Sequence, residues 1–217
     1  MGALLCRIIY IPSAIAVVAL VILFGRQPVE LPPVAAMTGF VTDDKMLAME
    51  HPSNWKPHSN AVAGSTTDMW YIPTRDAEIN VTADLAGSLM ADISKGPAVD
   101  LGGMSGSLPG GEEIKKKENR PLAAVHDMKG AELKKVHSDY EEGKTEETHL
   151  NGMEALATEF TFTKSALWGK KEMAGFRMSA IASDRRISVL CIYPKALQGT
   201  LQPIYMKMLA TFKYTQV

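Results

Sequence analysis

The sequence feature that most constrains the fold is the segment 186–193, in which both alternating sets of side chains are apolar. Its apolar members are Ile187, Val189, Leu190, Cys191 and Ile192. A strand with two apolar faces must be covered on both sides, so we predict that it lies centrally in a sheet. Residues 175–182 show a second strand pattern, and the short polar connection 183–185 predicts an antiparallel hairpin.

Strand and helix patterns divide most of the remaining chain. Strands are predicted at 46–50, 68–72, 78–83 and 156–163. Helices are predicted at 84–93, 119–143 and 197–212. Gly143 stands at the usual stop position of the second helix, and the Gly-rich stretch 95–111 predicts a long flexible loop. The order of elements indicates an α+β fold with a mainly antiparallel sheet covered by helices.

An apolar run at the N-terminus, residues 8–24, contains no charged side chain. A helix of this length spans roughly 25 Å at about 1.5 Å per residue, close to the thickness of a bilayer core. A cleaved signal peptide is the alternative, but no small-residue cleavage pattern follows the run. We therefore predict an uncleaved signal-anchor that contacts the membrane through residues 8–24.

The chain then divides into three parts. Residues 1–26 are the predicted anchor, the Pro-rich residues 27–36 are a stalk, and residues 37–217 form a single domain. A short N-terminal tail before a signal-anchor favours a domain outside the cytoplasm. We expect a single-pass membrane protein with the domain in the periplasm of a bacterial envelope.

Charge and motifs argue against several classes of function. The formal net charge is -1, and the basic run 115–117 is flanked by glutamates, so no nucleic-acid partner is predicted. The signatures of common hydrolases, zinc proteases and thiol redox proteins are not present in the sequence. Adjacent glutamates at 141–142 and 146–147 are interpreted as an exposed charged turn. No catalytic residue, metal or cofactor is predicted.

The histidines give no metal pattern. His126 and His137 are eleven residues apart on the predicted helix, about 16 Å along its axis, which is too far to share one ion. We interpret both as solvated. His51 and His58 flank Trp55 in a predicted loop, without a carboxylate or cysteine at ligand spacing. Cys191 is interpreted as inert core.

Two tryptophans are candidates for an interaction surface. Trp168 lies in a predicted loop beside Lys170 and Lys171, and Trp55 lies in the loop after the first predicted strand. Exposed aromatic side chains beside lysines are suited to a protein partner or a membrane interface. The alternative interpretation is that both tryptophans pack in or beside the core.

Short framework motifs resemble the PsbP-like superfamily. They are the segments 51–55 (HPSNW), 77–81 (AEINV), 152–155 (GMEA) and 208–212 (MLATF). His51 stands where that superfamily usually has an aromatic residue. The resemblance covers residues 46–214 and implies a sandwich of helix, sheet and helix that usually acts in interaction or assembly. It carries no catalytic residue to this chain, because fold and role are separable.

The expected function is therefore non-catalytic. An anchor, a stalk and a compact domain predict a membrane-tethered module that binds another envelope protein or assists complex assembly. The alternative is a small-ligand carrier or an unrecognised hydrolase with a pocket beside the Gly-rich loop 95–111. An exposed apolar patch favours the first hypothesis, whereas a deep pocket with converging polar groups favours the second.

Overall fold

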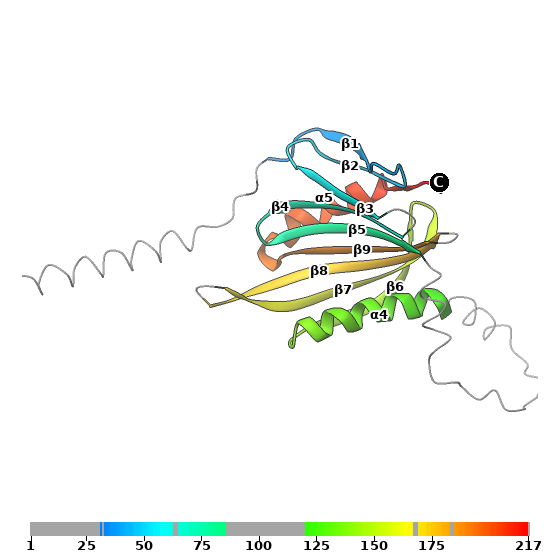
Figure 1. Cartoon of the computed structure of the whole chain (residues 1–217). Coiled ribbons are helices and arrows are strands. Elements are labelled where there is room, and N and C mark those ends of the chain that lie inside the picture. The colour runs from blue at the N-terminus through cyan, green and yellow to red at the C-terminus, as the bar shows by residue number, and fades with distance from the viewer. Residues whose placement is uncertain are drawn as a thin grey trace, which may run out of the picture.

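The computed structural model describes residues 31, 33–62, 65–85, 120–166, 169–182 and 185–216. Seven of its strands form one antiparallel sheet in the order β3-β4-β5-β9-β8-β7-β6 (Figure 1). Their bounds are β3 Pro57–Val62, β4 Thr66–Thr74, β5 Ala77–Leu85, β6 Glu141–Leu150, β7 Met153–Ala166, β8 Gly169–Ala182 and β9 Arg185–Pro194. The predicted hairpin is β8 and β9, and β9 is the middle strand, as its two apolar faces predicted.

The remaining elements cover the two faces of this sheet. A smaller sheet has the order β1-β2-β10, with β1 at Met37–Val41, β2 at Leu47–Pro52 and β10 at Lys213–Tyr214. The short helix η1, Lys195–Leu197, leads into α5, Gln198–Ala210. Helix α5 and the smaller sheet pack on one face, and helix α4, Arg120–Val136, packs on the other against β7 and β8 (Figure 1).

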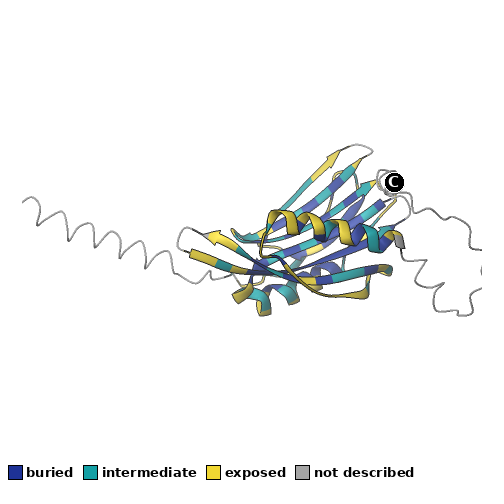
Figure 2. Ribbon diagram, turned by 90° about the horizontal axis from the view of Figure 1, so that it is seen from below, coloured by how far each residue is buried: buried dark blue, intermediate teal, exposed yellow. Residues whose placement is uncertain are grey.

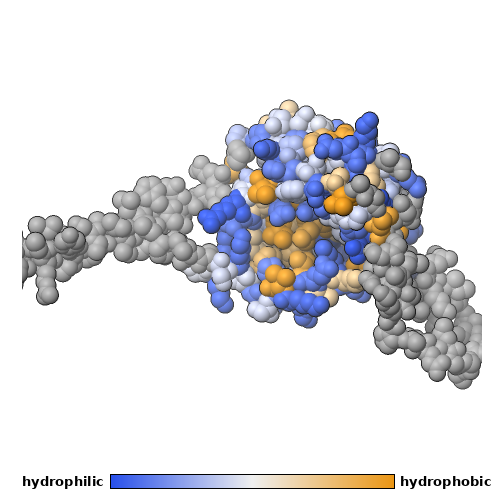
Figure 3. Space-filling view, in the orientation of Figure 1, coloured by the Kyte–Doolittle hydropathy of each residue, from blue (hydrophilic) through white to orange (hydrophobic). Residues whose placement is uncertain are grey.

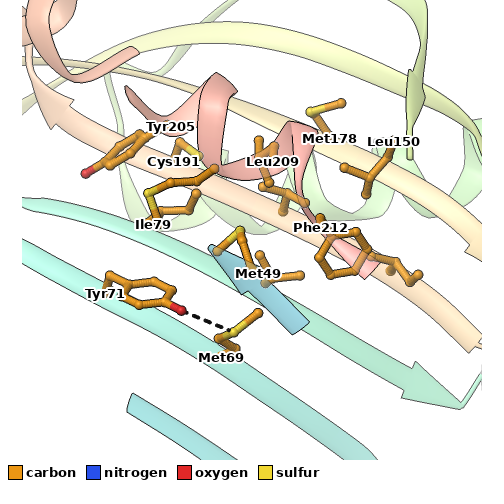
Figure 4. Close-up of a cluster of buried hydrophobic side chains, with 14 of the residues drawn as sticks. Met49, Met69, Tyr71, Ile79, Leu150, Met178, Cys191, Tyr205, Leu209 and Phe212 are labelled. Carbon is orange, nitrogen blue, oxygen red and sulfur yellow. Dashed lines mark hydrogen bonds between the residues drawn. The ribbon is translucent and has the colours of Figure 1, made fainter. Parts of the chain in front are cut away.

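The main hydrophobic core lies between the large sheet and the layer of α5 and β2. Ile79, Cys191 and Phe212 are fully buried there, and Figure 4 shows side chains from both layers pointing toward one another. The apolar stripe predicted for the last helix is confirmed, because Leu201 and Met208 on α5 are also fully buried. Burial raises the pKa of the Cys191 thiol, in agreement with an inert core residue.

The predicted helix 119–143 is wrong in its C-terminal part. Helix α4 ends at Val136, and Gly143 lies inside strand β6 instead of at a helix stop. The glutamates of β6 therefore belong to a strand and not to a turn. Strand β6 lies at the sheet edge with almost every residue exposed, so its sequence has no apolar alternation to reveal it.

The predicted helix 84–93 is wrong at its first two residues. Asp84 and Leu85 continue strand β5, where they pair with Arg186 and Arg185 of β9. Strand pairing with the central β9 overrides the helical spacing at these positions. The rest of that predicted helix, the Gly-rich loop 95–111 and the anchor 8–24 lie outside the described residues.

Three further strands had no prediction from the sequence, and they are β1, β3 and β10. Each is short or half-exposed, so hydrophobic periodicity does not mark it. Among the described residues, no helix is both long enough and apolar enough to cross a bilayer.

Candidate functional site

We call the face of the large sheet on which α4 packs the helix-side face. The part under α4 differs from the rest of it. One row of side chains crosses it from edge to edge through strand pairing, and its members are His58, Trp70, Asn80, Leu190, Arg177, Thr158 and Thr145. Helix α4 covers the end of this row on β7 and β8. Among the described residues, no helix packs over the other end of the row, on β3 and β4.

Under α4 the row contains a buried arginine, Arg177, which is only 2% exposed. Its guanidinium donates to Glu142 Oε1 from Nη2 at 2.9 Å and from Nε at 3.2 Å. It also donates from Nη1 to the backbone carbonyl of His126 in α4. Arg177 thus joins β8 to edge strand β6 and to the covering helix. Tyr140 completes the contact by donating to Glu142 Oε1 at 2.8 Å.

His126 is fully buried beside Arg177, so its interpretation as a solvated residue is wrong. Its ring nitrogens are hydrogen-bonded to two hydroxyls, Nδ1 to Ser179 Oγ at 3.0 Å and Nε2 to Thr158 Oγ1 at 2.7 Å. Burial, with a smaller contribution from the Arg177 charge, lowers the pKa of His126 from 6.5 to about 4. The imidazole is therefore neutral at pH 7.

We call His126, Glu142, Thr158, Arg177 and Ser179 the polar cluster. The sequence contains a pattern that indicates this cluster. Leu122, His126 and Gly130 follow one another at intervals of four residues, so they lie on one face of the helix, and Leu122 on that face is buried. Gly130 lies on α4 directly over the ion pair of the cluster. A Cβ there would lie 2.5 Å from Glu142 Oε1 and 2.7 Å from Arg177 Nη2. The glycine therefore lets the helix sit directly on the ion pair.

The second predicted helix histidine, His137, is not solvated either. It is half-buried just after α4 and stacks on Phe162, with ring centroids 3.9 Å apart. Phe162 belongs to a smaller hydrophobic cluster between α4 and the sheet, together with Leu133, Tyr140 and Phe160. The apolar and polar contacts together fix α4 over β7 and β8, so neither histidine is free on the surface. Figure 2 shows that the outer side of α4 is exposed.

Beside the hydrophobic cluster under α4, the described part of the helix-side face carries further apolar side chains, of which Leu190 and Ile192 also pack against that cluster. We define the open face by His58, Trp70, Ile72, Leu190 and Ile192. Ile72 is 51% exposed, and the other four are half-buried. In Figure 3 the centre of this face is hydrophobic and is bordered by hydrophilic residues. His58 stacks on Trp70 with ring centroids 5.5 Å apart and planes 13° apart, which makes a flat aromatic platform.

Polar side chains stand between and around these apolar residues. Asn80 separates Trp70 from Leu190 in the strand pairing, and Glu78 lies opposite Ile192. Asp68 accepts a hydrogen bond from Thr82 at 2.6 Å. Protein–protein interfaces combine apolar contacts with direct hydrogen bonds, so these polar groups are compatible with such an interface.

Two ion-pair groups border the open face. Asp84 pairs with Arg186 at 2.8 Å at one end. At the other end Asp76 accepts from Lys171 at 2.8 Å and from Lys164 at 2.9 Å. These two lysines lower the pKa of Asp76 to about 2, so the carboxylate is ionised at any physiological pH.

The predicted interaction surface must be corrected at Trp55. Its indole is 5% exposed and packs edge-on against Tyr205 of α5 with ring centroids 5.9 Å apart, so it is a core residue. It lies in the turn after β2, where its backbone N–H donates to the Pro52 carbonyl at 2.8 Å. Lys170 is exposed, and Lys171 is half-buried in its ion pair with Asp76. Trp168 lies outside the described residues.

The described residues offer shallow hollows. One, of about 280 Å³, is lined by residues of β6, β7 and β8 and the start of α5, and another, of about 470 Å³, lies at the strand ends near Tyr214. No group of three metal-ligating side chains occurs within the described ranges. The predicted pocket beside 95–111 involves residues outside them.

Comparisons with known proteins give structural similarity alone. No family model and no curated protein matches the chain. The solution structure of cyanobacterial PsbP (CyanoP) from Synechocystis has a TM-score of 0.44 at 9% identity, covering 88% of this chain and 99% of that chain. The Saccharomyces cerevisiae Ran-binding protein Mog1p has a TM-score of 0.43 at 10% identity, covering 83% and 96%.

A third similar structure is PA94 of Pseudomonas aeruginosa, described as a protein of unknown function and putative regulator. Its TM-score is 0.38 at 11% identity, and the match covers 84% of this chain and 100% of that chain. The seven-stranded antiparallel sheet with helices on both faces agrees with the α+β fold that the sequence predicted, and these structures are similar to it at TM-scores below 0.5. Identities this low concern the fold alone, so no partner or activity is carried over.

Proposed function

We propose that this protein is a membrane-anchored, non-catalytic domain that binds another envelope protein through its open face. The observation that supports the proposal is the aromatic and apolar surface around Trp70 and Ile72, over which no described helix packs, on a sheet face that α4 covers elsewhere. Four strands about 4.8 Å apart make a surface roughly 15 Å wide, enough for one helix of about 10 Å diameter. A protein segment therefore suits the open face.

The shape of the open face also favours a protein over a small ligand. Small-ligand sites enclose most of the ligand surface, whereas Ile72 projects from a strand with half of its surface exposed. Asn80 and Glu78 supply hydrogen-bonding groups between the apolar residues. A partner with apolar side chains and hydrogen-bond donors matches this pattern.

The binding test is a matched pair of substitutions in the full-length chain. Ile72→Asp places a charge in the open face, and Val136→Asp places the same charge on α4 at a residue that is 74% exposed. Proteins recovered with the tagged chain from solubilised membranes are identified, and each is then purified and titrated against both variants. Ile72→Asp should weaken binding by about 10-fold or more, as expected when a charge enters an apolar contact of an interface, and Val136→Asp should not. Equal affinity of both variants would remove the open face from the proposal.

The membrane anchor has its own test. The full-length chain should remain in the membrane pellet after a high-salt and alkaline wash, whereas a chain lacking residues 1–36 should be released. Release of the full-length chain by the same wash would contradict an anchor at residues 8–24. This result would leave the binding test unaffected.

A further inference from the structure

Among the described residues, strand β3 is an edge of the large sheet, and no strand pairs with its outer side. It pairs with β4 along its whole length, from Pro57 opposite Tyr71 to Val62 opposite Thr66. No backbone hydrogen bond joins residues 57–61 to a described residue other than those of β4. The last three residues of β3 are exposed. Its outward N–H and C=O groups are a template for one more strand.

The two edges of the large sheet differ in how they resist such pairing. Edge strand β6 carries four glutamates and a lysine, and its register shifts between Glu142 and Thr145. Charges and bulges of this kind discourage an added strand. Strand β3 has the sequence PHSNAV, with no charged side chain. The sheet is therefore protected at β6 and unprotected at β3.

We propose that two copies of this chain pair through β3 in an antiparallel arrangement, joining their large sheets into one. A second copy matches the edge because a neutral strand does not repel its own copy, and antiparallel pairing satisfies both edges at once about a two-fold axis. Pro57 has no N–H to donate, so the paired segment is 58–62. The centre of that segment, Asn60, lies on the two-fold axis.

This pairing extends the helix-side face across both copies. His58, Asn60 and Val62 are opposite Trp70, Asp68 and Thr66 of β4, so their side chains lie on that face. In the pair, Val62, which is 54% exposed, lies opposite His58 of the second copy. The two Asn60 amides meet at the axis and can hydrogen-bond to each other. The two open faces then form one continuous surface. The inference does not depend on what the open face binds.

Disulfide formation tests the pairing and its register. Residues directly opposite in an antiparallel pair have Cα atoms about 4.5–5.5 Å apart, within the range that a disulfide requires. Cys6→Ser is introduced into the full-length chain, and Cys191 is buried and serves as the unreactive background. Asn60→Cys is compared with Glu146→Cys, an exposed position on the charged edge β6. Covalent dimer is followed on non-reducing gels during mild oxidation.

The proposal predicts that Asn60→Cys forms dimer at least about 10-fold faster than Glu146→Cys, because only the first pair is held at bonding distance. A mixture of Ser59→Cys and Ala61→Cys should cross-link between the variants faster than either does alone. Asn60→Lys, in a chain without added cysteines, should shift sedimentation toward the monomer. Equal rates for Asn60→Cys and Glu146→Cys, or a faster rate for the latter, would overturn the pairing. Faster self-linking of Ser59→Cys would overturn the register.

Discussion

Replacing Arg177 with methionine should lower the free energy of unfolding more than the same replacement of an arginine nearer the surface. The change removes three hydrogen bonds, two to Glu142 and one to the backbone carbonyl of His126. Breaking a buried pair by removing one partner costs about 3–5 kcal/mol. Glu142 keeps 35% of its side-chain surface in water, which places the expected loss at the lower end, about 3 kcal/mol.

The assay is urea unfolding followed by circular dichroism, with Arg186→Met as the matched control. Arg186 is paired with Asp84, and both side chains keep about a quarter of their surface exposed, so its loss should cost about 1 kcal/mol or less. The melting temperature of Arg177→Met should fall by about 6–12 °C. Adding Glu142→Gln to Arg177→Met should recover part of the stability, since no unpaired charge then remains. Equal losses for Arg177→Met and Arg186→Met would refute the argument.

Two further predictions follow from the polar cluster. Because the pKa of His126 is about 4 in the native state and 6.5 when unfolded, only the unfolded chain binds its proton between these values. Stability should therefore fall by about 3 kcal/mol as the pH decreases from 6.5 to 4, and the decrease should be smaller in His126→Gln. Gly130→Ala should lower the melting temperature despite the better helix propensity of alanine, because the new Cβ meets Glu142 and Arg177. Gly199→Ala on α5, with nothing within 4 Å, should raise it; equal shifts for both glycines would contradict the close approach.

The candidate site was only partly predictable from the sequence. Trp70 and Ile72 lie in a segment that alternation predicted as a strand, but alternation does not say which face a helix covers. Arg177 follows Met173 and Gly175 on one side of β8, and a charged residue at that position is buried only because Glu142 and α4 meet it. Trp55 was wrongly expected at the surface because the packing of α5 on the sheet, and not local sequence, buries it.

What the sequence determined was the central part of the fold. Two apolar faces on β9 required a layer on each side, and the apolar spacing of α5 supplied one of those layers, since both are local patterns with a fixed period. Only the tertiary structure decided which strands form the edges of the sheet and which part of the helix-side face α4 covers. Strands β3 and β6 gain their pairing from a neighbour, and α4 packs mainly on β7 and β8. These contacts join residues that are far apart in the sequence and depend on how the layers pack. The periodicity of the sequence is local and therefore does not predict them.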